Sequence, residues 1–215
     1  MLLLDDTHIR IGNAEYAKSN ESYGLTTILD EHARIVGSEI RFRFRAKSGK
    51  VCETVIHSPR AARIAKHCQD LPGHELFAYL DSHGEPRDIQ SGDINDYLFT
   101  ASGLPITAKD FRTWHGTTVA AETLMRLGFP AQGKGALSNA ELKRRETRAV
   151  KAASIALFNT VATCRRFYVH PELITAYAGG RLARCFERAD RSAKPRELKL
   201  SERAVFEFLK AASRS

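Results

Sequence analysis

The stretch EIRFRFRAKSGKVCETVIHS, residues 39–58, carries the clearest structural pattern in the chain. Over its first half, three apolar residues alternate with three basic ones: Ile40, Phe42 and Phe44 with Arg41, Arg43 and Arg45. This strict period of two predicts a strand with one apolar and one basic face. Because Ser48-Gly49 supplies a turn and the alternation resumes in KVCETVIHS, we expect a β-hairpin over about 40–57, with Lys47 and Lys50 flanking its tip. The basic face is either solvated or covered by an anionic partner.

Helical spacing and capping signals predict that most of the remaining chain is α-helical. Helical patterns occur in SPRAARIAKHCQDL and SGDINDYLFTAS, whereas PGHELF and DSHGEPRD between them have the composition of loops. Thr107 with Asp110, and Ser138 with Glu141, have the spacing of capping boxes at the starts of two longer helices. We therefore expect a mainly α fold with a small β-hairpin or sheet.

A tyrosine stands near a break in the stretch NTVATCRRFYVHP, residues 159–171. Pro171 disfavours helical geometry at the residue before it, and PELITAYAGG then begins a new short helix. Tyr168 therefore lies at the trailing end of a helical segment, where we expect its side chain to be offered outward. This candidate nucleophile segment spans about 157–180, and a basic helical tail with an amphipathic pattern follows over 181–215.

The balance of charge favours a polyanionic partner such as nucleic acid. The 215 residues include 33 Lys and Arg against 25 Asp and Glu, a formal net charge of +8. Four cysteines without a C-x-x-C pair, and histidines without metal-ligand spacing, predict reduced thiols, no metal and no cofactor. Since no apolar run approaches the ~18 residues that span a bilayer, and no signal peptide is recognisable, we expect a cytoplasmic protein without a membrane partner.

A tyrosine that attacks a phosphodiester needs a defined set of neighbours. The transition state carries extra negative charge on the non-bridging phosphate oxygens, which arginine guanidinium groups bind through paired hydrogen bonds. The departing oxygen needs a proton donor, and nearby cations stabilise the phenolate that develops from a group with an ordinary pKa of about 10. Arginines, a lysine and a tyrosine are therefore a coherent set for this chemistry.

Four motifs, HIRIGNAEYAKSNESYGLTTILDEH, FRAKSGK, KDFRTWHGT and NTVATCRRFYVHP, follow one another along the chain. In order and spacing they resemble the catalytic domain of type IB DNA topoisomerases, in the small bacterial and poxvirus-like branch. The resemblance covers about residues 8–177 and implies the catalytic fold of DNA breaking-rejoining enzymes. Members of this family normally carry an N-terminal, mostly β domain that closes over the duplex. Because the chain starts almost at the first motif, we expect residues 1–215 to form a single catalytic domain without that clamp.

The resemblance implies a catalytic role for five residues. Arg10 and Arg112 match the two arginines expected to clamp the scissile phosphate. Lys47 matches the hairpin lysine that serves as general acid toward the leaving 5′ oxygen. Asn159 matches a position that is histidine in poxvirus and eukaryotic enzymes and asparagine in bacterial relatives, where it hydrogen-bonds a phosphate oxygen. Tyr168 matches the nucleophile.

Further basic residues are candidates for assistance or for DNA binding. Lys109, three positions before Arg112, matches a lysine that assists in this family, and Lys50 is the substitute for Lys47. The candidate DNA contacts are Arg41, Arg43, Arg45, Lys50, Arg144, Arg145, Arg165 and Arg166. The run KRRETR, which contains two of them, is either a phosphate-binding or a solvated helix face.

The expected reaction is a transesterification on double-stranded DNA. Tyr168 forms a 3′-phosphotyrosyl link and frees a 5′-hydroxyl strand, which swivels before religation and so relaxes supercoils. Because the link conserves the energy of the phosphodiester, neither ATP nor a metal is required. We expect a monomer associated with the nucleoid, which clamps DNA together with an N-terminal domain if one exists.

Two alternative functions remain open. A tyrosine recombinase shares the fold and the chemistry, but it usually has His-x-x-Arg where this chain has Lys109-Asp-Phe-Arg112. The second alternative is a non-catalytic DNA-binding module on the same scaffold.

Overall fold

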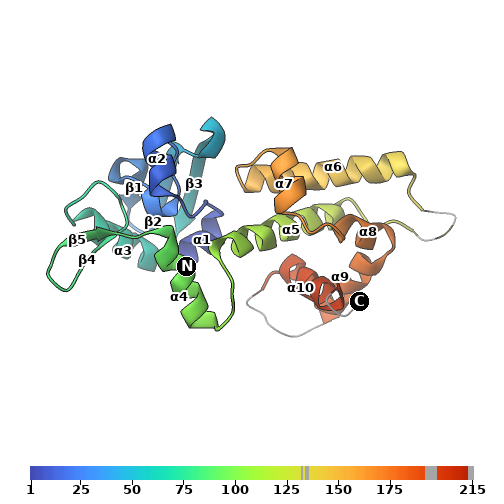
Figure 1. The fold of residues 1–215 in the computed structure, drawn as a ribbon. Helices are drawn as coiled ribbons and strands as arrows, with labels where there is room; N and C mark the ends of the chain where they lie inside the picture. The colour runs from blue at the N-terminus through green and yellow to red at the C-terminus, as the bar shows by residue number, and fades with distance from the viewer. Residues whose placement is uncertain (132, 134–135, 192–197, 213–215) are drawn as a thin grey trace. The chain divides into compact units, whose positions relative to one another are not determined.

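The computed structural model describes residues 1–131, 133, 136–191 and 198–212. The described residues are mainly α-helical and include a small antiparallel sheet, so the predicted fold class is confirmed (Figure 1). They divide into two compact units, Met1–Arg112 and Thr113–Ser215, and the boundary falls inside helix α5 (Ala108–Arg126).

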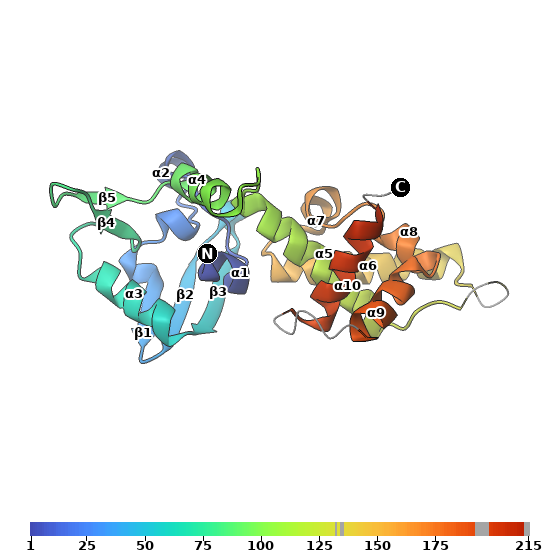
Figure 2. The same cartoon turned by 90° about the horizontal axis from the view of Figure 1, so that it is seen from below.

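The first unit combines a three-stranded sheet with short helices. Its elements are α1 (Leu2–Thr7), α2 (Ala14–Asn20), η1 (Leu25–Thr27), η2 (Asp30–His32), β1 (Ala33–Val36), β2 (Glu39–Arg45), η3 (Lys47–Gly49), β3 (Val51–His57), α3 (Pro59–Gln69), β4 (Ala78–Leu80), β5 (Pro86–Asp88) and α4 (Ser91–Ser102). Helix α3 packs against β1 and β2, and α1 packs against β3 (Figure 2). The α3 helix starts as predicted, because the Ser58 hydroxyl accepts a hydrogen bond from the Ala61 N–H at 3.2 Å.

Alternation along β2 places its apolar side chains inside the unit and its arginines outside. β2 pairs antiparallel with β1 and with β3, and Phe44 lies opposite Cys52 in the second pair. Ile40, Phe42 and Phe44 are buried, while the three arginines of the strand are exposed, as the period of two predicts. The connection to β3 is closed by a hydrogen bond from the Ala46 N–H to the Lys50 carbonyl at 2.7 Å.

Part of the segment predicted as loops forms a second, two-stranded sheet. β4 pairs antiparallel with β5, and Ala78 lies opposite Asp88. The carboxylate of Asp81 holds the intervening turn by accepting hydrogen bonds from the N–H groups of His83 and Glu85, at 2.9 and 3.0 Å. The loop prediction for this part of DSHGEPRD was wrong, because strands of three residues are too short to show a period of two.

The second unit consists of helices around a main apolar core and a smaller apolar cluster. Beyond the boundary inside α5, its helices are α6 (Asn139–Ala156), α7 (Val161–Phe167), α8 (Leu173–Ala178), α9 (Arg181–Arg191) and α10 (Leu200–Ala212). Each of the two predicted capping pairs is joined by a hydrogen bond of the capping-box type. The Thr107 N–H donates to the Asp110 carboxylate at 2.8 Å, and the Ser138 hydroxyl accepts from the Glu141 N–H at 3.2 Å.

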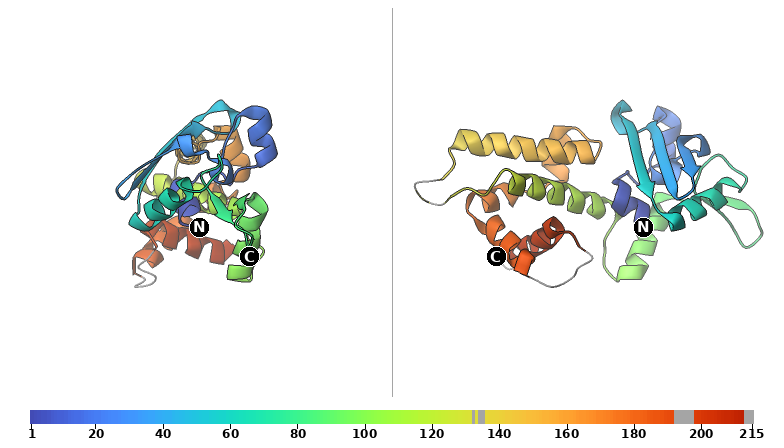
Figure 3. Two further views of the ribbon diagram at one scale, coloured as in Figure 1. Left: turned by 90° about the vertical axis from the view of Figure 1, so that its left-hand side faces the viewer. Right: turned by 180° about the vertical axis from the view of Figure 1, so that it is seen from behind.

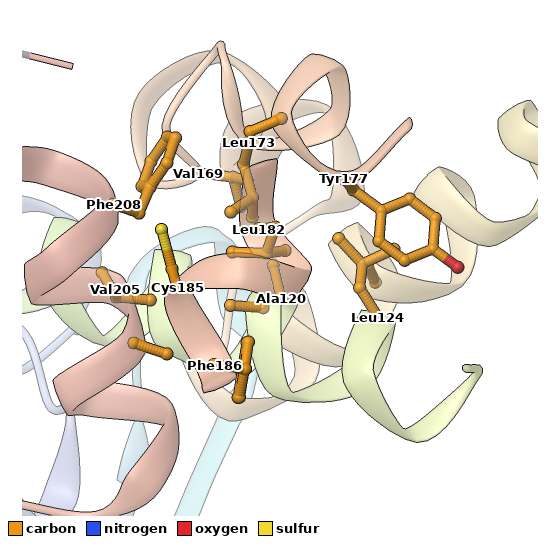
Figure 4. Packing of buried hydrophobic residues seen from close by; sticks show 14 of the residues in the cluster. Ala120, Leu124, Val169, Leu173, Tyr177, Leu182, Cys185, Phe186, Val205 and Phe208 are labelled. Carbon is orange, nitrogen blue, oxygen red and sulfur yellow. The ribbon is translucent and has the colours of Figure 1, made fainter. Parts of the chain in front are cut away.

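Within the segment 181–215, expected as a basic helical tail, α9 and α10 contribute directly to this core. Helices α9 and α10 pack against each other (Figure 3). Their apolar side chains, including Leu182, Phe186 and Phe208, gather with Ala120 and Leu124 of α5 (Figure 4). The amphipathic pattern of this segment therefore reflects packing inside the unit.

Arg145 occupies a structural position in the second unit. Its guanidinium donates to the Gly128 carbonyl at 2.8 Å and to the Tyr177 hydroxyl at 2.7 Å, and it pairs with Glu141 at 3.0 Å. The fully buried Tyr177 in turn donates its hydroxyl proton to the Gly128 carbonyl at 2.7 Å. One side chain of the KRRETR run thus ties α6 to the end of α5 and to α8.

The neighbouring arginine provides a matched test of this role. We expect Arg145→Ala to lower the free energy of unfolding by about 1.5–3 kcal/mol, because it removes charge-assisted hydrogen bonds to the Tyr177 hydroxyl and the Gly128 carbonyl. Arg144→Ala removes only an exposed pair with the same Glu141 and should cost less than about 1 kcal/mol. Urea denaturation of both variants measures the difference, and equal losses would contradict the structural role of Arg145.

Candidate functional site

The predicted site residues are divided between the two units. Arg10, Lys47, Lys109 and Arg112 belong to the first unit, whereas Asn159 and Tyr168 belong to the second. The first unit therefore supplies the cations of the predicted set. The second supplies its phenol and its amide.

Arg10 is held through its backbone by the segment that contains GLTT. The Leu25 N–H donates to the Arg10 carbonyl at 2.8 Å, and the Thr26 N–H donates to the Ile11 carbonyl at 2.7 Å. A Cβ atom on Gly24 would lie 2.6 Å from the Arg10 carbonyl oxygen, so only glycine permits this approach. Two parts of the first quoted motif thus pack on each other and fix the backbone at Arg10.

Arg112 is the last residue of the first unit and lies near the start of α5. Its side chain is only 4% exposed, and its guanidinium donates a hydrogen bond to the His8 carbonyl. Burial raises the pKa of the nearby Cys52 thiol to about 12, and the positive charge of Arg112 opposes this rise. The thiol is therefore protonated at neutral pH. Lys109, one turn earlier, is exposed.

Lys47 lies at the tip of the β2–β3 hairpin, as predicted. The ammonium group is 5.0 Å from the centre of the Tyr16 ring and makes a cation–π contact with it. Tyr16 is itself placed by the start of α2, where the Asn13 side chain accepts a hydrogen bond from the Tyr16 N–H at 2.7 Å. Lys47 is exposed to solvent despite this contact, and Lys50 is exposed on the other side of the tip.

The basic face of the sheet carries carboxylates beside its arginines. Arg41 pairs with Glu39, and this guanidinium holds the pKa of Glu39 below its ordinary value. Arg43 lies opposite Glu53 in the strand register, and Arg45 lies 3.9 Å from the carboxylate of Glu21. These arginines are exposed at the surface and remain accessible to an anionic partner.

Sequence reasoning missed one arginine of this face. Arg34 of β1 is exposed and lies directly opposite Arg41 in the strand register. The alternation in ARIV, residues 33–36, could have indicated an edge strand, but four residues give a weak signal.

The remaining candidate DNA contacts lie on α6 and α7. Arg144 is exposed and pairs with Glu141 at 2.9 Å. Arg165 pairs with Glu146 of α6, and the Arg166 guanidinium lies 5.0 Å from the centre of the Phe167 ring. Arg145 differs from these residues, because its guanidinium is committed to the hydrogen bonds inside the unit described above.

Asn159 closes the C-terminal end of α6. Its N–H donates to the Ser154 carbonyl at 2.9 Å, and the Phe158 N–H donates to the Ile155 carbonyl at 3.1 Å, which together form a Schellman motif. Phe158 takes the left-handed position of this motif with a φ of 52°, where glycine is usual. Asparagine at position 159 is compatible with a helix cap or a turn, but no glycine marks the left-handed position at Phe158. Asn159 lies in the short connection between α6 and α7, and its side chain is buried.

Tyr168 caps the C-terminal end of α7, as the sequence predicts. Its N–H donates to the Cys164 carbonyl at 3.0 Å. The side chain is only 8% exposed and packs with Val150, Leu157 and Cys164, so the expectation that it is offered outward was wrong. The reason is that α7 packs on α6, and the residue at the helix end still lies over apolar side chains of α6.

Two residues of α5 contact the backbone that follows Tyr168. A Cβ atom on Gly116 would overlap the carbonyl oxygen of Tyr168, so the segment approaches the helix more closely than a side chain allows. The Thr117 hydroxyl accepts a hydrogen bond from the His170 N–H at 3.1 Å. Sequence reasoning missed both residues. The available signal was a glycine inside a predicted helix, which costs roughly 1 kcal/mol and usually has a packing reason.

The described part of the chain has no group of three or more His, Cys, Asp or Glu residues arranged to hold a metal ion. Among these residues, no helix has the length and apolar character needed to cross a membrane.

An apolar cavity of about 470 Å³ in the first unit is lined by residues that include Leu2, Ile64 and Tyr97. Its lining contains none of the predicted catalytic residues.

Comparison with known proteins gave two matches. The family described as the catalytic core of eukaryotic DNA topoisomerase I matches residues 1–177. The DNA topoisomerase 1B of Acanthamoeba polyphaga mimivirus is 26% identical over 174 residues, which cover 78% of this chain and 50% of the viral protein. The chain thus spans about half the length of the curated relative that it matches. Helices α9 and α10 lie beyond the residues matched by the family.

Two glycines inside helices allow the contact at Gly116 to be tested. We expect Gly116→Ala to lower the free energy of unfolding by about 1–3 kcal/mol, because the added methyl group overlaps the Tyr168 carbonyl. Gly92→Ala is the control, since Gly92 lies in α4 with nothing within 4 Å of an added Cβ atom. This variant should leave stability unchanged or raise it by up to about 1 kcal/mol. Similar unfolding curves for both variants would rule out the close approach.

Proposed function

Because the chain belongs to the family of the eukaryotic DNA topoisomerase I catalytic core, we propose that it is a type IB DNA topoisomerase. It relaxes supercoiled double-stranded DNA by transient cleavage and religation of one strand. The observation that carries the proposal is the placement of Tyr168. Its carbonyl abuts Gly116 of α5, the helix in which Arg112 lies four residues earlier. The same helix thus carries one predicted phosphate clamp and the contact that fixes the predicted nucleophile.

The reaction exchanges one phosphodiester for another. The Tyr168 phenol oxygen bonds to the scissile phosphorus, its proton passes to solvent, and the bond from phosphorus to the 5′ oxygen breaks. The Lys47 ammonium protonates the departing 5′ oxygen, and Arg10 and Arg112 stabilise the charge that develops on the non-bridging oxygens. Asn159 donates a further hydrogen bond to the phosphate. Religation is the reverse sequence, and the bond energy is conserved without ATP.

DNA binding has to move the Tyr168 side chain. The phenol ring packs against Val150, Leu157 and Cys164, and a scissile phosphate can react only with an accessible phenol oxygen. We expect the ring to leave these contacts when DNA binds, while the backbone contacts at Gly116 and Thr117 keep the segment in place. Lys109, exposed on the first turn of α5, assists at the phosphate.

The DNA backbone contacts exposed basic residues of the sheet, of the hairpin tip and of α6 and α7. This group comprises Arg34, Arg41, Arg43, Arg45, Lys50, Arg144, Arg165 and Arg166. Arg145 is left out, because its guanidinium is engaged in hydrogen bonds inside the second unit. We propose that the two units act as one catalytic domain on the duplex and that the protein works as a monomer. It acts in the cytoplasm, at the nucleoid. A β-rich clamp domain would add contacts on the opposite side of the duplex.

The decisive experiment is relaxation of supercoiled plasmid in EDTA without ATP. We expect the wild-type protein to relax the plasmid and to form a covalent adduct that denaturant traps. Tyr168→Phe should do neither and should still bind DNA, because only the attacking oxygen is removed. Tyr97→Phe, which changes an exposed tyrosine, is the control and should keep full activity.

Three outcomes separate the alternatives. A Tyr168→Phe protein that relaxes plasmid would remove Tyr168 from the mechanism. Strand exchange between two defined sites by the wild-type protein would identify a tyrosine recombinase. Binding without any trapped adduct would identify a non-catalytic DNA-binding module.

The salt dependence of DNA binding tests the basic face of the sheet. Each phosphate contact contributes about 0.9 to the slope of log K against log salt concentration. We expect Arg43→Gln to weaken binding and to reduce this slope by about 0.9, because Arg43 is exposed on the basic face. Arg87→Gln, on β5 and paired with Asp81, should leave the slope unchanged. Equal slopes for Arg43→Gln and wild type would contradict a phosphate contact at Arg43.

A further inference from the structure

The segment that follows Tyr168 is held from two directions within the second unit. On one side, α5 contacts it through Gly116 and through the hydrogen bond from the His170 N–H to the Thr117 hydroxyl. On the other side, Val169 is buried in the same core cluster as Phe208 of α10. Its backbone therefore lies between α5 and the helices at the C-terminal end of the described chain.

An aromatic and cationic cluster makes the second set of contacts. The His170 ring meets the Phe208 ring edge to face, with centroids 5.2 Å apart and an interplanar angle of 89°. The Arg181 guanidinium lies 5.5 Å from the centre of the same Phe208 ring. Arg181 also pairs with Glu172 at 2.8 Å, and the Glu172 N–H donates to Nδ1 of His170 at 3.3 Å.

These contacts join the nucleophile segment to helices outside the matched family region. His170 and Glu172 lie two and four residues after Tyr168, inside the matched residues 1–177, whereas Arg181 and Phe208 lie beyond them. Phe208 is fully buried, so its ring offers a rigid surface to His170. The ion pair and the ring contacts converge on the same short stretch of backbone.

We propose that Phe208 and Arg181 are positioning residues for the nucleophile Tyr168. They act through His170 and Glu172, and they hold the backbone on which the phenol must swing toward the phosphate. The inference rests on the proposed topoisomerase function. A displacement of about 1 Å at a reacting group can cost on the order of 100-fold in rate, so loosening this backbone should slow the chemical step.

Two phenylalanines of the same core provide a matched comparison. Phe208→Leu keeps an apolar side chain in the core but removes the ring that His170 and Arg181 contact. Phe186→Leu makes the same change in α9, where the ring faces Phe129 at 5.5 Å. Both variants should lose similar amounts of stability in thermal unfolding, so stability alone cannot explain a difference in rate.

The measurement is single-turnover cleavage at saturating DNA, with DNA affinity determined separately in a Tyr168→Phe background. We expect Phe208→Leu to slow covalent adduct formation by about 10- to 100-fold with an unchanged Kd. Phe186→Leu should cleave within about twofold of wild type. Equal cleavage rates for the two variants, or a Phe208→Leu rate equal to wild type, would overturn the proposal.

A second pair of variants leaves the core intact. Arg181→Gln removes the cation over the Phe208 ring and the pair with Glu172, whereas Arg184→Gln changes an exposed arginine one turn later in α9. Arg181→Gln should also slow cleavage, by a smaller factor than Phe208→Leu. Identical cleavage rates for Arg181→Gln and Arg184→Gln would contradict the positioning role, even if Phe208→Leu does not fold. If wild type forms no adduct at all, the proposed function fails, and the positioning role fails with it.

Discussion

The carbonyl of Tyr168 lies so close to helix α5 that only glycine fits at position 116. The backbone of the proposed nucleophile segment therefore packs directly against the backbone of this helix. Thr117 adds a hydrogen bond to the same stretch, and the apolar core holds Val169. A close-packed interior has few ways to rearrange, so these contacts would keep the segment in place during the proposed movement of the phenol ring.

The arginines of the first unit differ in the groups that contact them, and a DNA phosphate would have to displace those groups to bind. Arg41 and Arg45 lie beside carboxylates at the surface, where an ion pair contributes only about 0–1 kcal/mol. A phosphate can replace such a carboxylate at little cost and offers two parallel hydrogen bonds to the guanidinium. Arg112 is buried, and its guanidinium donates to the His8 carbonyl. A buried charge needs such a contact, which also fixes the direction of the side chain.

Local patterns in the sequence predicted the elements that depend on neighbours in the chain. The hairpin followed from a period of two, and α5 and α6 followed from capping boxes at Thr107 and Ser138. The short strands β4 and β5 were missed because three residues carry no period. Asn159 was compatible with a helix cap or a turn, but the left-handed conformation of Phe158 before it has no local signal, because glycine is the usual residue at such a position. The assignment of the catalytic residues came from the order of four motifs and remains a proposal.

The sequence by itself determined the mainly α fold, the basic face of the hairpin and the position of Tyr168 at a helix end, because each depends on periodicity, capping or a proline a few residues away. Only the tertiary structure decided that the Tyr168 ring is buried, that Arg145 is tied to Tyr177, and that α9 and α10 belong to the core. Each of these depends on contacts between residues far apart in the chain. Such contacts depend on how separate helices and strands pack together, and the sequence pattern of a single helix or strand does not specify that packing.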